Sequence, residues 1–69
     1  MTNTYIDRLN AEYEELVERV EKLAVFIDES EQFDTLSKRE QQLLSQQLGF
    51  MESYRSVLDL RLHIANNPS

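Results

Sequence analysis

The sequence predicts an all-α protein in which two long antiparallel helices form a hairpin that assembles into an oligomeric helical bundle. Apolar residues recur at spacings of three and four over two long stretches, which is the period of a helix face. Gly49 and Pro68 are the only glycine and proline, so little interrupts a helix. With 69 residues and no cysteine, the chain is expected to be one hairpin domain over residues 1–69 without disulfides.

The first helix is expected over about residues 4–29. Thr4 suits an N-cap, and Asp7 stands where a capping box has its acid. The apolar seam keeps unbroken heptad spacing and consists of Ile6, Leu9, Tyr13, Leu16, Val20, Leu23 and Ile27. The opposite face is acidic and includes Asp7, Glu14, Glu15, Glu18 and Glu21. This helix therefore has one face for a core and one face for solvent.

The second helix is expected over about residues 37–65. Ser37 and Glu40 form a Ser-x-x-Glu capping box, and an Asn-Asn-Pro sequence follows Ala65. A short connector and matched helix lengths favour an antiparallel pair. In the connector, Phe33 and Leu36 are expected to fold back over the end of the core.

The second helix carries two apolar rows where one would suffice. The first row is Leu44, Leu48, Met51, Arg55, Leu58, Leu62 and Ala65, and the second is Leu43, Gln47, Phe50, Tyr54, Val57, Arg61 and Ile64. One row covers the first helix, and the other is left for an interface between copies of the chain. The expected interface residues are Leu43, Leu48, Phe50, Met51, Val57, Leu58 and Ile64. For Gly49, close helix packing is favoured over room for a ligand.

Self-association is also expected from size, because a chain this short gains only about 3–5 kcal/mol from a single core. No apolar run approaches the ~18 residues of a membrane span, and no signal peptide is expected. The lack of cysteine fits a reducing cytoplasm.

The net charge of −6 is concentrated in the first half, where residues 1–36 hold ten acids and three bases. Binding to long DNA or RNA depends on neutralising phosphates, so a long nucleic acid is not an expected partner. A small anion is not excluded, because a pocket needs only a few local cations.

Arg55 and Arg61 each interrupt an apolar row, and an arginine in a dry setting needs an anionic or carbonyl partner. One interpretation is a phosphate site at an oligomer interface. The other, which composition favours, is an interfacial salt bridge to a glutamate of the first helix, or a position at the rim of the interface where the charged end of the arginine reaches solvent. Tyr5 and Tyr54 are placed to stack on a base. The expected ligand-binding set is Arg55, Arg61, Tyr54, Tyr5 and Arg8.

A catalytic role is not expected. No Ser/His/Asp set, phosphate-binding loop or Cys-x-x-Cys motif occurs, and the glutamates of the first helix are typical of a solvated face. His63 lies in the last turn, where it interacts with the helix dipole. No metal and no cofactor are expected.

Two stretches resemble a known family. Glu15–Leu23 is similar to the first helix, and Gly49-Phe50-Met51 with Arg55-Ser56-Val57 to the second helix, of the hairpin domain of phage anti-CBASS and anti-Thoeris sponges. Tyr5-Ile6-Asp7-Arg8-Leu9 and Phe33-Asp34-Thr35-Leu36 resemble motifs of short phage proteins related to a crAss-like phage gene product. Here the second helix continues through Ile64, whereas the sponge domain is expected to end sooner, so the ligand's identity is not transferred.

The resemblance implies a phage counter-defence protein of the host cytoplasm. It would sequester a cyclic-nucleotide or ADP-ribose-type immune signal as a homo-oligomer, without cleaving it. It also singles out Arg55, which aligns with the arginine after the Gly-Phe-Met segment. Two alternatives stay open: an inhibitor that presents the acidic helical face to a host defence protein, and a structural accessory of the phage particle.

Overall fold

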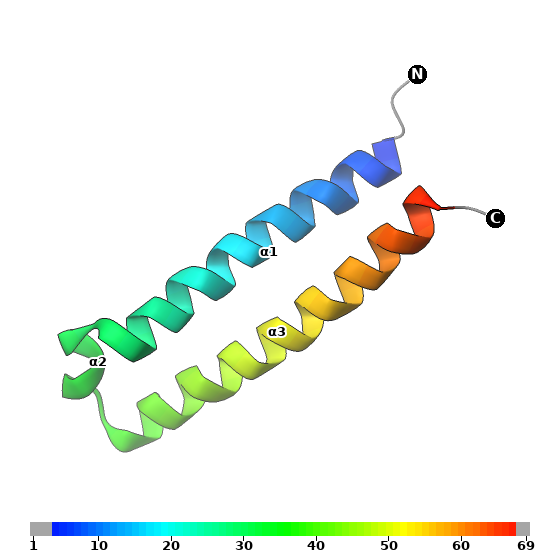
Figure 1. The fold of residues 1–69 in the computed structure, drawn as a ribbon. Coiled ribbons are helices and arrows are strands. Elements are labelled where there is room, and N and C mark those ends of the chain that lie inside the picture. Colours follow the sequence, from blue (N-terminus) through cyan, green and yellow to red (C-terminus); the bar gives the residue numbers. More distant parts are fainter. Residues whose placement is uncertain (1–3, 68–69) are drawn as a thin grey trace.

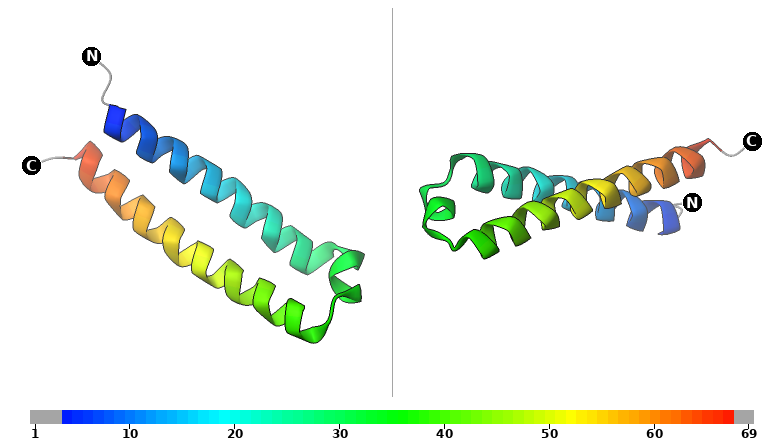
Figure 2. Two further views of the ribbon diagram at one scale, coloured as in Figure 1. Left: turned by 180° about the vertical axis from the view of Figure 1, so that it is seen from behind. Right: turned by 90° about the horizontal axis from the view of Figure 1, so that it is seen from below.

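The computed structural model describes residues 4–67 as a helical hairpin with a short helix at its bend. Helix α1 spans Thr4–Glu29, α2 spans Glu31–Thr35 and α3 spans Lys38–Asn66. Helices α1 and α3 run antiparallel side by side, and α2 closes the end opposite the two termini (Figure 1). Viewed from below, α1 and α3 cross each other in projection (Figure 2). The predicted all-α hairpin is thereby confirmed.

The hairpin is long and thin. It measures 50 × 18 × 14 Å, with a radius of gyration of 15.6 Å. A compact domain of this length has a radius of gyration of about 11 Å. Two helices in a single layer cannot enclose a round core, so most residues retain an exposed side.

One seam of apolar side chains holds α1 against α3. Its buried members are Leu9, Leu16, Val20, Leu58 and Leu62, against which Tyr13, Leu48, Met51 and Ala65 pack half-buried. All seven residues of the predicted α1 seam are buried or half-buried. Among residues 4–67, Leu58 alone is wholly buried, with 0% of its surface exposed. The heptad pattern therefore identified the face of α1 that meets α3.

The helix ends fit the sequence prediction. The Ser37 hydroxyl oxygen accepts a hydrogen bond from the Glu40 backbone N–H at 3.1 Å, which caps α3 as predicted. Within the described residues α1 begins at Thr4, at the expected start, and the cap predicted for this end lies outside what the structure describes.

The connector contains a turn of helix that the sequence pattern did not predict. Ser30 caps α2 through its hydroxyl, which accepts from the Gln32 N–H at 3.1 Å. Phe33 packs edge-on against Phe26 of α1, with ring centroids 6.1 Å apart. The Gln41 side-chain amide donates to the carbonyls of Phe33 and Leu36, at 2.9 and 3.2 Å. The bend is thus tied to both long helices.

Gly49 does not mediate close packing, so that interpretation is wrong. A Cβ built on Gly49 meets no heavy atom within 4 Å. No helix within residues 4–67 has the length and apolar character that a membrane crossing requires.

We expect Leu58→Ala to lower the free energy of unfolding by about 2–5 kcal/mol, because it leaves a cavity at the one fully buried position. Leu60→Ala is the matched control, since Leu60 lies on the same helix with 63% of its surface exposed and should change stability by less than about 0.5 kcal/mol. Urea unfolding followed by far-UV circular dichroism measures both. If the two substitutions lowered the free energy of unfolding equally, the packing of Leu58 between α1 and α3 would be contradicted.

Candidate functional site

The two apolar rows of α3 have opposite environments. Every residue of the first row is buried or half-buried against α1. Every residue of the second row, which we call the outer row, is exposed, and it comprises Leu43, Gln47, Phe50, Tyr54, Val57, Arg61 and Ile64. Phe50 and Ile64 are exposed by 73% and 71%. Within a single chain, α3 therefore presents an unpartnered apolar face.

This placement corrects the expected interface residues. Leu58 lies entirely inside the hairpin and offers no surface to another chain. Leu48 and Met51 pack half-buried against the hairpin's own core. The rows lie side by side on one helix, and the sequence does not state which of them α1 covers. Leu43, Phe50, Val57 and Ile64 remain exposed, as an interface would require.

Two polar bridges link α1 to α3 along one edge of the hairpin. Arg61 Nη2 donates to the Tyr5 hydroxyl oxygen at 2.9 Å, and the Arg61 guanidinium lies 6.0 Å from the Tyr5 ring centroid. The Tyr54 hydroxyl donates to a carboxylate oxygen of Glu12. Tyr5 and Glu12 are seven residues apart on α1, as are Tyr54 and Arg61 on α3. The bridges therefore share one antiparallel register, about 10 Å apart along the hairpin.

A small pocket opens beside the Tyr5–Arg61 bridge. Its volume is about 160 Å3, and it is lined by Tyr5, Arg8, Leu9, Glu12 and Arg61. Three of the five predicted ligand residues, Tyr5, Arg8 and Arg61, thus meet around one cavity, although they come from opposite ends of the chain. Tyr54 adjoins it through its bond to Glu12. Glu12 was not among the residues predicted from the sequence, because it meets Tyr54 only through the pairing of α1 with α3. Its position on the flank of the heptad seam is the sequence signal for such pairs.

The bridges fix the protonation states at this edge. The hydrogen bond to Tyr5 and the neighbouring charge of Glu12 both raise the pKa of Arg61, so it stays cationic. The hydrogen bond to Glu12 raises the pKa of Tyr54 above its ordinary value of 10.0, so Tyr54 keeps its proton. The pocket therefore combines two arginines with one carboxylate and suits an anionic group.

Arg55 is not part of this pocket. It is half-buried in the row that faces α1, and its side chain makes no hydrogen bond or ion pair with any residue of the 4–67 segment. The expected salt bridge to a first-helix glutamate is therefore not formed within the hairpin. The one ion pair among the described residues joins Lys22 and Glu18 on the surface of α1 at 2.8 Å.

A larger hollow lies on the outer row. Its volume is about 540 Å3, and its walls are Leu43, Gln46, Gln47, Phe50, Met51 and Tyr54. Apolar and aromatic groups dominate it, with two side-chain amides at its edge. It is open, uncharged and next to the polar bridge of Tyr54.

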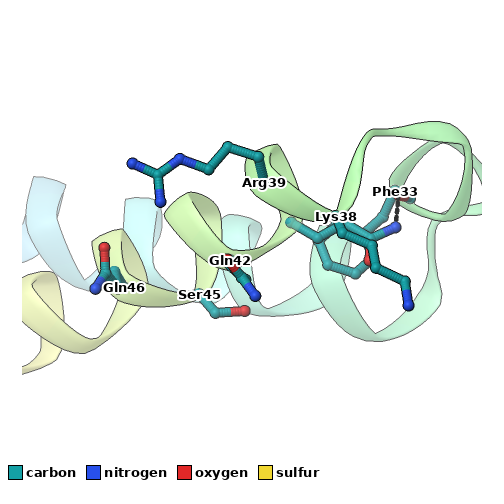
Figure 3. Close-up of a pocket in the computed structure, with 7 residues that line it drawn as sticks. Phe33, Lys38, Arg39, Gln42, Ser45 and Gln46 are labelled. Carbon is teal, nitrogen blue, oxygen red and sulfur yellow. Dashed lines mark hydrogen bonds between the residues drawn. The ribbon is translucent and has the colours of Figure 1, made fainter.

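A third hollow of about 530 Å3 lies at the bend (Figure 3). Phe33 forms one wall, and Lys38 and Arg39 extend from the first turn of α3. Both cations are exposed, as expected from their position in the chain. Arg8 and Arg61 are exposed as well, so the difference between the two places is that a hydrogen bond to Tyr5 holds Arg61 in position, whereas no such bond within residues 4–67 holds Lys38 or Arg39. Within residues 4–67, no three histidine or acidic side chains are grouped to hold a metal ion.

A family model described as Sequestin matches residues 3–64 of the chain. No curated protein and no solved structure gives a significant match. The family name denotes sequestration, which indicates a binding protein rather than an enzyme.

Glu12→Gln is expected to return the pKa of Tyr54 toward its ordinary value of 10.0, because the carboxylate that stabilises the protonated hydroxyl is lost. A pKa that is raised in the folded state adds stability at neutral pH, and this contribution disappears as the pH rises through that pKa. Tyrosinate absorbance during alkaline titration measures the shift. Glu15→Gln is the control, since Glu15 lies exposed on α1, and an identical titration of the two variants would contradict the Tyr54–Glu12 bridge.

Proposed function

The chain belongs to the Sequestin family, and from this premise we propose that it is a phage counter-defence protein that sequesters a small nucleotide immune signal without cleaving it. The observation that carries the proposal is the pocket between Tyr5, Arg8 and Arg61. The proposed ligand is a cyclic-nucleotide or ADP-ribose-type signal, and the proposed place of action is the host cytoplasm, where such a signal would act.

The chemistry of the pocket supports a phosphate as the group that is held. Guanidinium groups bind phosphate oxygens through paired, charge-assisted hydrogen bonds. Arg61 is already positioned by Tyr5, so little side-chain entropy is lost when an anion binds. The Tyr5 ring, 57% exposed, offers a face for a base or a sugar.

A sequestering protein must bind its ligand tightly and be present in many copies, but it need not catalyse a reaction. The pocket side chains hold charge and offer stacking, and its one carboxylate, Glu12, already accepts a hydrogen bond from Tyr54. A protein of this kind acts by mass action: each occupied site removes one signal molecule from solution. A small chain that can be made in many copies suits this role.

The acidic outer face of α1 supports a second candidate, an inhibitor that binds a host defence protein. Glu14, Glu15 and Glu21 are exposed there, and their side chains form no hydrogen bond or ion pair with any residue from 4 to 67. Such a protein would act on its target without any nucleotide present. Binding measurements with purified nucleotides therefore separate the two functions.

We expect Arg61→Ala to weaken nucleotide binding at least about tenfold, because a charge-assisted contact to phosphate is lost. Arg55 lies outside this pocket and has no internal anion to pair with. A loss of similar size with Arg55→Ala would add a second phosphate contact on the row that faces α1. Titration calorimetry with cyclic dinucleotides, cyclic trinucleotides and ADP-ribose derivatives measures both, beside thermal melts of each variant.

Arg39→Ala is the matched control for these variants. Arg39 is an exposed arginine of α3 that lines the hollow at the bend, far from the Tyr5–Arg61 bridge. The Arg39→Ala variant should bind nucleotides with unchanged affinity. If Arg39→Ala weakened nucleotide binding and Arg61→Ala did not, the anion would bind at the bend instead. A lower melting temperature without any change in binding would assign Arg55 or Arg61 a structural role only.

The bound nucleotide is expected to be recovered intact. Heat denaturation after long incubation should release the unmodified compound from each complex, as judged by liquid chromatography. A cleaved product that accumulates in proportion to the protein concentration would make the protein an enzyme.

A further inference from the structure

Glu12 differs from most charged residues of the hairpin because it is partly enclosed. Among residues 4–67, every charged residue is exposed except Glu12 and Arg55, which are half-buried. Glu12 also forms part of the wall of the pocket that contains Arg8 and Arg61. A carboxylate that is partly removed from water acts more strongly on neighbouring charges than one in open solvent. Glu12 is therefore the acid best placed to influence what the pocket binds.

The charge of Glu12 is not neutralised by either arginine of the pocket. Arg8 and Glu12 are four residues apart on α1, a spacing at which opposite charges commonly pair on a helix. The one ion pair among the described residues lies elsewhere on α1, so Glu12 pairs with neither Arg8 nor Arg61. Its carboxylate accepts a hydrogen bond from the Tyr54 hydroxyl instead. Because this donor is neutral, the negative charge stays in the wall of the pocket.

The net charge of the pocket follows from these contacts. Tyr5 raises the pKa of Arg61 most, and the charge of Glu12 raises it further, so the carboxylate acts on the guanidinium without bonding to it. Two guanidinium cations and one carboxylate leave the pocket with one net positive charge. The hydrogen bond from Tyr54 keeps the carboxylate tied to α3, which prevents it from turning toward Arg8.

The phosphate groups of nucleotides fall into two classes by charge. A phosphodiester, as in a cyclic nucleotide, carries a single negative charge, and so does each phosphate of the pyrophosphate in an ADP-ribose derivative. A terminal phosphate carries a charge of about −1.5 to −2 at neutral pH. One net positive charge balances a phosphate of the first class. The additional charge of a terminal phosphate would be repelled by the Glu12 carboxylate.

We propose that Glu12 makes this pocket select phosphates with a single charge and reject terminal phosphates, and that Tyr54 positions Glu12 for this role. The inference rests on the proposed function. In a cavity of about 160 Å3, a phosphate bound by Arg8 and Arg61 lies close to the Glu12 carboxylate. Specificity then comes from repulsion of the wrong ligand as well as from attraction of the right one.

A sequestering protein needs such selectivity because each site removes only one ligand molecule. A site that accepted any phosphate would fill with ordinary nucleoside mono-, di- and triphosphates by mass action. All of these compounds end in a terminal phosphate, whereas the phosphates of a cyclic nucleotide are all diesters. A carboxylate in the pocket wall therefore keeps the site available for the signal.

Matched pairs of nucleotides test the selectivity. Each cyclic nucleotide of the panel is compared with its ring-opened linear form, which has the same bases and sugars and one terminal phosphate. ADP-ribose is compared with ADP. Titration calorimetry at low ionic strength, where exposed charges are least screened, gives the ratio of the two dissociation constants. The unmodified chain should bind the member without a terminal phosphate at least about fivefold more tightly.

Glu12→Gln should reduce this ratio about three- to fivefold, because it removes the charge while its amide oxygen still accepts from the Tyr54 hydroxyl. The gain in affinity should be larger for the compound with the terminal phosphate. Glu15→Gln is the matched control, since it makes the same change in net charge at an exposed position of α1 that does not line the pocket. It should leave the ratio unchanged.

Tyr54→Phe tests the positioning of Glu12, because it removes the hydroxyl and keeps the ring. The released carboxylate should pair with Arg8, so both members of each nucleotide pair should bind several-fold more weakly. Adding Glu12→Gln to Tyr54→Phe should then restore the affinity of Glu12→Gln alone, because no carboxylate is left to compete for Arg8. A double variant that binds as weakly as Tyr54→Phe would contradict the positioning role.

The inference and the proposed function fail in different ways. If the unmodified chain binds a cyclic nucleotide or ADP-ribose but Glu12→Gln shows the same ratio as Glu15→Gln, Glu12 does not set the selectivity. The inference is then wrong, while the proposed function stands. If the unmodified chain binds no member of any pair, the proposed function fails and the inference fails with it.

Discussion

Everything in this hairpin depends on one seam between α1 and α3, in which Leu58 is wholly enclosed. Because there is no second layer, the seam alone sets the register of the two helices. That register brings Tyr5 to Arg61 and Glu12 to Tyr54. A shift of one turn would separate both pairs and the pocket beside them. Apolar packing therefore positions the polar groups, and the polar groups themselves bury little surface.

The same constraint explains the uncovered face of α3. A helix of 29 residues can turn only one side toward a single neighbour. Its other apolar side must face water or a second chain. The exposed acids of α1 and the uncharged stretch Gln41–Met51 of α3 are two unlike regions of the exterior.

The sequence predicted the long helices well, because heptad spacing and the Ser37 cap are local signals. It missed α2, since five residues are too few to show a helical period. It identified both rows of α3 but mixed them in the expected interface, because the pairing of α1 with α3 is a non-local property. Glu12 was not predicted for the same reason, since it meets Tyr54 only through that pairing.

The two bridges join residues that are far apart in the sequence. Tyr5 and Arg61 are 56 positions apart, and Glu12 and Tyr54 are 42 positions apart. They lie in the half of the hairpin away from the bend, where the termini also lie (Figure 1). Local contacts near α2 form early, and this open end is the last to close and the first to fray. In the proposed complex, a ligand between Arg8 and Arg61 would hold α1 and α3 together at that end. Occupancy would therefore slow amide hydrogen exchange in the first turns of α1 and the last turns of α3, and leave the bend unchanged.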